Sequence, residues 1–203
     1  YEAMADKHEY ISSSPLKINN KESIAKNLAI YSAFTEGLQL FSSFAILLNF
    51  PRFGKMKGMG QIVTYSIRDE SLHVEAMTKL FREFMQENIN LWTDDFKKEI
   101  YTVCRQMVKL EDKFLDLVFE MGDIQGLTKS EMKEYIRYIA DRRLLQLGLK
   151  TNFGVKDNPI DWIDDVLGVE HQNFFEGRAT TYMKGGLKGS MESVQFKGIA
   201  VEG

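Results

Sequence analysis

The sequence predicts an all-α protein, and three observations support this. Only 3 of the 203 residues are proline, so long helices need few interruptions. No segment alternates apolar and polar residues as a half-buried strand does. Four long segments carry helix-forming residues and are bounded by helix start or stop signals. We therefore expect a helical bundle.

The first two long segments lie in the N-terminal half. Polar residues 1–24 are typical of the end of one element and a loop, and an apolar helix is expected over 24–50, stopped by Pro51. A glycine-rich link over 54–60 leads to a second helix over 61–86. Its apolar residues recur at the spacing of one helical face and are Leu72, Ala76, Leu80 and Phe84.

The remaining helices are bounded by clearer signals. A third is expected over 93–121 and a fourth over 128–147, each beginning at a threonine N-cap. Glu131 completes a capping-box pattern at the start of the fourth. A short helix is expected over 159–167, and from His171 onward the frequent glycines predict a flexible tail.

Composition excludes several classes of protein. Apolar residues make up 44% and charged residues 27%, as in ordinary globular proteins. A net charge of -3 gives no reason to expect a nucleic-acid partner. The single cysteine, Cys104, excludes a disulfide scaffold. The apolar helix is interrupted by too many polar residues to be a convincing membrane span, so no membrane is expected either.

One carboxylate stands out in the first long helix. Glu36 is the only charged residue between Asn27 and Phe50. A helix apolar on all sides is expected to be buried in a core, where an unpaired carboxylate is costly. Glu36 therefore needs a basic partner, a second carboxyl that shares a proton, or a metal ion.

The second helix supplies two further candidate ligands. Glu70 and His73 are three residues apart, so both project from nearly the same helical face. Di-iron and di-manganese bundles use one Glu from each of two helices and a Glu-x-x-His pair from each of two others. Glu36, Glu70 and His73 match half of that set.

The other half of the set is missing. A Glu-x-x-His pair needs a glutamate three residues before the histidine. The two other histidines have Ala5 (before His8) and Gly168 (before His171) at that position. Either two copies each donate half a site, or the other half lies upstream of Tyr1. Because the chain does not begin with methionine, we expect it to be a truncated, split or processed part of a longer protein.

The motifs resemble those of one family. Residues 34–37 (Phe-Thr-Glu-Gly), the pair Phe44-Ala45, residues 68–73 (Arg-Asp-Glu-Ser-Leu-His) and residues 173–176 (Asn-Phe-Phe-Glu) are similar in order and spacing to motifs of the class I ribonucleotide reductase small (beta) subunit. The resemblance covers essentially the whole chain but only the C-terminal part, somewhat over half, of a typical small subunit.

The resemblance implies a ferritin-like fold around a dinuclear metal centre. That centre generates a radical, which passes to a large catalytic (alpha) subunit and starts the reduction of ribonucleotides to deoxyribonucleotides. Glu36, Glu70 and His73 match the ligands of the second metal. Iron is the expected metal, and manganese or a mixed pair is the alternative, because both ions use the same oxygen-rich ligand types.

The resemblance also assigns two catalytic residues. Asp69 matches an aspartate that supports electron and proton transfer near the histidine of the other half; the alternative is an exposed acid paired with Arg68 or Lys79. Tyr182 matches a tyrosine that relays the radical, six residues after Glu176 in a tail that docks on the large subunit. The alternative is an ordinary surface tyrosine.

Further expectations follow from the same resemblance. Leu40 and Phe44 correspond to a hydrophobic pocket around the radical site, or else to plain core. Residues 1–170 are expected to form part of the metal-binding domain and 171–203 the docking tail. We expect a cytoplasmic homodimer, and we expect this chain alone to be inactive.

Two other functions remain open from the residues. The chain can be a different ferritin-like di-iron oxidase or iron-binding protein, although such proteins lack the tail pattern. It can also be a non-catalytic helical interaction protein in which Glu36, Glu70 and His73 form a buried ion-pair network.

Overall fold

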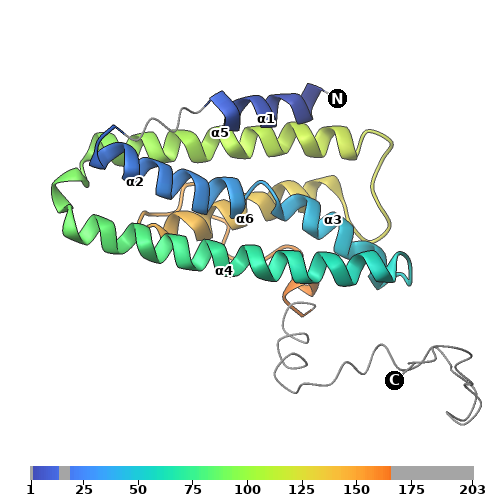
Figure 1. Cartoon of the computed structure of the whole chain (residues 1–203). Helices are drawn as coiled ribbons and strands as arrows, with labels where there is room; N and C mark the ends of the chain where they lie inside the picture. The colour runs from blue at the N-terminus through green and yellow to red at the C-terminus, as the bar shows by residue number, and fades with distance from the viewer. Residues whose placement is uncertain (1, 14–18, 166–203) are drawn as a thin grey trace, which may run out of the picture. The chain divides into compact units, whose positions relative to one another are not determined.

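The computed structural model describes residues 2–13 and 19–165, and its regular elements are helices (Figure 1). These are α1 (Glu2–Ser13), α2 (Lys21–Ala29), the π-helix η1 (Ile30–Glu36), α3 (Phe41–Arg52), α4 (Lys57–Glu87), the 3-10 helix η2 (Ile89–Leu91), α5 (Asp94–Val118) and α6 (Lys129–Gln146). Within the described residues, β pairing is limited to one isolated bridge between Ile124 and Leu127. The all-α prediction is confirmed.

The segment formed by α2, η1 and α3 lies inside the bundle. Figure 1 shows it between the long helices α4 and α5, and η1 contacts α4, α5 and α6. The short helix α1 packs on α5. The core between these helices consists of large, fully buried side chains, among them Phe34, Leu38, Ile67, Phe81, Ile100, Met107, Leu115, Met132, Ile136 and Leu144.

The predicted starts of the third and fourth helices are confirmed by their caps. The Thr93 side chain accepts a hydrogen bond from the Phe96 N–H at 3.2 Å. At α6, Thr128 and Glu131 bond each other's backbone N–H groups, which is the capping box that the sequence predicts. Because capping is a local interaction, the sequence alone is enough to locate it.

The prediction of one helix over 24–50 is wrong. The chain changes to a π-helix at Ile30 and forms a turn at residues 37–40 before α3 begins. The Gly37 N–H donates to the Ser32 carbonyl and the Gln39 N–H to that of Phe34, each at 3.1 Å and five residues back. Apolar content alone does not distinguish this wider turn from an α-helical one, because it does not reveal which residues face the core. Pro51 also lies inside the last turn of α3, which ends one residue later, at Arg52.

The predicted apolar face of α4 is also wrong. Leu72 and Leu80 are 58% and 50% exposed, Ala76 is exposed, and Phe84 is half-buried. The face that meets the core instead carries Val63, Thr64, Ile67, Val74, Thr78, Phe81 and Met85. The helix has two apolar stripes, and only tertiary packing decides which of them is covered.

No helix among the described residues is long and apolar enough to cross a membrane.

Candidate metal centre

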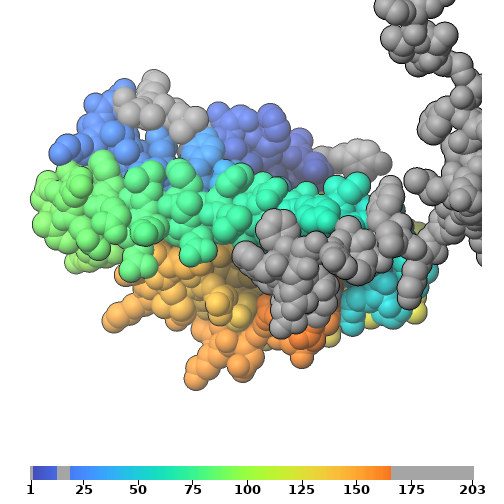
Figure 2. Space-filling view, turned by 60° about the horizontal axis from the view of Figure 1, so that its bottom comes forward, coloured from blue at the N-terminus to red at the C-terminus, as the bar shows by residue number. Residues whose placement is uncertain are grey.

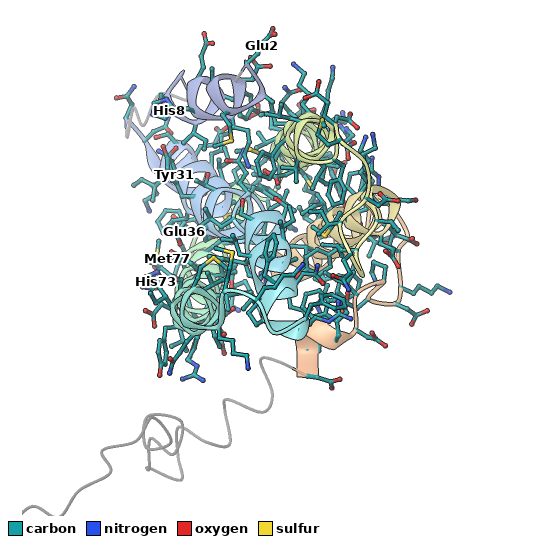
Figure 3. All side chains as sticks on the ribbon, turned by 90° about the vertical axis from the view of Figure 1, so that its right-hand side faces the viewer. Glu2, His8, Tyr31, Glu36, His73 and Met77 are labelled. Carbon is teal, nitrogen blue, oxygen red and sulfur yellow. The ribbon has the colours of Figure 1, made fainter. Side chains whose placement is uncertain are left out.

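Two helical segments bring the three predicted ligands together. Glu36 lies at the end of η1, and Glu70 and His73 lie near the middle of α4. One ligand atom from each residue can be chosen so that all three lie within 4.8 Å of one another. Figure 3 shows Glu36 and His73 on the same side of the molecule. Residues 34 positions apart in the sequence thus form one cluster of donors.

Within the cluster, Glu70 and His73 are neighbours on α4. The distance from His73 Nδ1 to Glu70 Oε2 is 3.6 Å, which is longer than a hydrogen bond. The side chain of Glu70 is 26% exposed, whereas that of His73 is 63% exposed. The cluster therefore reaches from the edge of the core to the surface. Glu36 is half-buried, which corrects the prediction that it lies fully inside the core.

The polar atoms of the cluster fit a cation. Glu70 Oε2 is buried and has no hydrogen-bond partner. Removing a carboxylate oxygen from water without giving it a hydrogen-bond donor costs free energy, and a positive ion bound beside the oxygen offsets that cost. Two carboxylates and one imidazole form a mostly oxygen ligand set, which suits iron or manganese.

The other predicted residues that the structure describes differ in how far they are buried. Asp69 is exposed on α4, next to Glu70. Phe44 is half-buried and packs edge-on against Phe41, with the ring centroids 5.9 Å apart. Leu40 is exposed, so it does not line a closed pocket as the sequence predicts. Its place in the turn after η1, rather than in a continuous helix, explains the difference.

Several predictions fall on residues that the structure does not describe. Tyr182, Glu176 and the tail 171–203 lie outside the described residues, as does the predicted domain boundary after residue 170. These remain predictions.

Sequence reasoning missed two features of the site. One is the π-helix that ends in Glu36. The other is Arg143 of α6, which is buried and whose Nε atom lies 2.8 Å from the Gly37 carbonyl oxygen. Arg143 follows Arg142 in a charge-rich helix, and the sequence gives no signal for which of the two makes such a contact.

Comparison with known proteins decides which family has this architecture. The model of the family described as "Ribonucleotide reductase, small chain" matches residues 1–159. The chain belongs to this family. Its small-subunit fold is also found in solved structures. The R2 subunit of ribonucleotide reductase from Clostridium botulinum superposes with a TM-score of 0.75 at 25% identity, covering 81% of this chain and 53% of that one.

Other members of the ribonucleotide reductase small-chain family are more similar in sequence. A probable ribonucleoside-diphosphate reductase small subunit of Invertebrate iridescent virus 3 is 41% identical over 93% of this chain and 55% of its own length. Its counterpart in Invertebrate iridescent virus 6 is 38% identical, over 97% and 65%. A putative class I ribonucleotide reductase from Bacillus halodurans gives a TM-score of 0.68 at 30% identity, over 81% of this chain and 57% of that one.

These matches confirm the predicted family and the ferritin-like fold. The chain is a homologue of the ribonucleoside-diphosphate reductase small subunit, a family that typically binds a dinuclear metal centre. It spans between about half and two thirds of the length of the two viral relatives.

Proposed function

We propose that this chain supplies the ligands of one metal in the dinuclear centre of a ribonucleoside-diphosphate reductase small subunit. The observation that carries the proposal is the convergence of Glu36, Glu70 and His73 around a buried carboxylate oxygen that lacks a donor. When bound, the metal pair supplies the one-electron oxidation that precedes radical transfer to the large subunit. There, ribonucleotides are reduced to deoxyribonucleotides.

The residues of this chain have three different roles in the proposed centre: metal binding, ligand orientation and radical transfer. The carboxylates of Glu36 and Glu70 balance the charge of the metal, and the imidazole of His73 adds a neutral donor. The exposed Asp69 carboxylate accepts a hydrogen bond from a metal ligand of the other half and thereby fixes the orientation of that ligand. Tyr182 relays the radical to the large subunit, because a phenol can lose an electron together with a proton.

The surface around the ligands supports the need for a second half. Apolar side chains continue along α4 beside His73, and Figure 2 shows α4 running along the molecular surface in green and teal. The exposed members of this stripe are Ile62, Tyr65, Leu72, Ala76 and Leu80. Exposed apolar patches of this kind mark interaction surfaces. The part of the small subunit that this chain lacks relative to its relatives covers the stripe and completes the site, and the chain alone is inactive.

The proposal extends to the assembled enzyme, which contains two kinds of subunit. The small subunit forms a homodimer that joins the large subunit in the cytoplasm. The tail residues Glu176 and Tyr182 make the contact with the large subunit.

The ligand assignment is tested by metal titration of variants. Glu36→Gln keeps the shape of the side chain but removes its charge, so affinity for Fe²⁺ or Mn²⁺ falls at least about tenfold while the melting temperature changes little. Glu75→Gln is the matched control, because Glu75 is an exposed acid on α4 outside the cluster. His73→Ala is compared in the same way with His8→Ala, since both histidines are exposed.

The result also separates the alternative functions. If Glu36→Gln changes stability but leaves metal affinity at the wild-type value, the three residues form a structural ion-pair network and the proposal is wrong. If the variant loses metal but the chain does not associate with any large reductase subunit when supplied with its other half, a different ferritin-like protein is the better assignment.

A further inference from the structure

A buried guanidinium lies directly behind the π-helix. Arg143 on α6 is 8% exposed, and its Nε donates to the Gly37 carbonyl oxygen at 2.8 Å. Its Nη1 donates to Gln146 Oε1 at 2.9 Å, and the guanidinium lies 4.8 Å from the centroid of the Phe41 ring. Burial lowers the pKa of Arg143 to about 10, which still leaves it charged at neutral pH. A fixed positive charge is therefore held against the residue that follows Glu36.

The Gly37 carbonyl is a suitable acceptor for this charge. Gly37 is the C-cap of η1, where the last carbonyls lack intrahelical donors and carry the negative end of the helix dipole. A Cβ atom at this position would lie 2.7 Å from Arg143 Nε and 2.5 Å from the Ala33 carbonyl oxygen. The contact thus depends on glycine at this position.

A second cation, on α1, holds the same turn. Lys7 on α1 donates to the Gln39 carbonyl oxygen at 3.2 Å and forms a buried ion pair with Glu111 of α5. Ser42, in the first turn of α3, also donates to Glu111. The turn that separates η1 from α3 is thereby fixed by α1, α5 and α6 together.

We propose that Arg143 is a positioning residue for Glu36, which it holds in the π-helical register through the Gly37 carbonyl. A π-turn contains one residue more than an α-turn and is rare on its own, so it persists where outside contacts hold it. If the segment relaxed to α-helical geometry, Glu36 would rotate by about 100° relative to α2 and leave Glu70 and His73. This inference rests on the proposed function only for the consequence on metal binding.

Hydrogen–deuterium exchange of the metal-free chain tests the inference. Arg143→Met removes the charge and the donors while keeping much of the length, and Arg143→Lys restores the charge. Arg142→Met is the matched control. Arg142 is the exposed neighbour of Arg143, and it donates a hydrogen bond to the Tyr138 hydroxyl at 3.0 Å rather than to the turn after η1. We expect Arg143→Met to speed exchange in residues 30–41 about tenfold, the effect of one lost charge-assisted hydrogen bond. Arg143→Lys is expected to give an intermediate rate and Arg142→Met no change.

Metal titration gives the second readout. Affinity for Mn²⁺ falls at least about tenfold in Arg143→Met, is partly regained in Arg143→Lys and is unchanged in Arg142→Met. A purely structural role would lower the melting temperature without this order among the folded variants. If Arg143→Met does not fold, the intermediate exchange of Arg143→Lys carries the test.

Two outcomes overturn the inference. One is unchanged exchange in residues 30–41, and the other is faster exchange spread equally over α4 and α5. If the chain completed with its other half binds no metal, the proposed function fails, but the exchange experiment still decides whether Arg143 holds the π-helix.

Discussion

The substitution Gly37→Ala tests the close packing behind the metal ligand. The added Cβ would lie 2.5 Å from the Ala33 carbonyl oxygen and 2.9 Å from that of Ser32, and both are backbone atoms that cannot rotate away. The φ angle of Gly37 is -82°, which alanine adopts freely, so the cost is steric rather than conformational. Overpacking of this kind costs about 2 kcal/mol.

For a chain of this size, that loss corresponds to a drop in melting temperature of about 4–8 °C. Calorimetry or thermal unfolding followed by circular dichroism measures it. Because the clash lies next to Glu36, metal affinity in the folded protein falls as well.

Gly58→Ala is the control for this measurement. Gly58 lies in the first turn of α4, and a Cβ there meets nothing within 4 Å. Alanine is the better helix former, so this change is neutral or stabilises by up to about 1 kcal/mol. If the two variants are equally stable, Gly37 is not closely packed and the account of the π-helix is wrong.

Three further predictions concern other buried groups. Asp141 accepts four hydrogen bonds from the backbone N–H groups of residues 152–155 at 2.7–3.1 Å. Asp141→Asn leaves two of these N–H groups without an acceptor, so urea unfolding should show a loss of stability of about 2–6 kcal/mol. A loss under about 1 kcal/mol would contradict the geometry. Burial raises the pKa of Glu111 above its usual 4.5 despite Lys7, so its contribution to stability is present below that pH and is lost as the pH rises through the folded-state pKa. Glu111→Gln should therefore gain stability relative to wild type as the pH rises above about 4.5, and the opposite trend in urea unfolding would refute this. Burial raises the pKa of Cys104 to about 12, so iodoacetamide at about pH 8 should label it only in denaturant; rapid labelling of the folded chain would show that the thiol is accessible.

Local signals explain what the sequence predicts well. The starts of α5 and α6 follow from threonine caps whose partners are three residues away. The pairing of Glu70 with His73 follows from helical spacing alone. Glu36 joins these two residues in the structure, with one possible ligand atom from each of the three lying within 4.8 Å of the others.

Tertiary contacts explain what the sequence could not predict. The π-helix ends against Arg143 and Lys7, which lie 106 and 32 residues from the carbonyls they bond. The covered face of α4 is chosen by the helices packed on it, and the stripe that contains Leu72 looks equally suitable in the sequence. Both errors lie next to the candidate metal site, where local preference and the final structure differ most.

Metal stoichiometry tests the central claim most directly. Anaerobic titration with Fe²⁺ is performed on the 203-residue chain alone and after addition of a polypeptide that carries the other carboxylates and the second Glu-x-x-His pair. Half a ligand set predicts at most one tightly held metal per isolated chain and two per completed small subunit. Two tightly held metals on the isolated monomer would contradict the account.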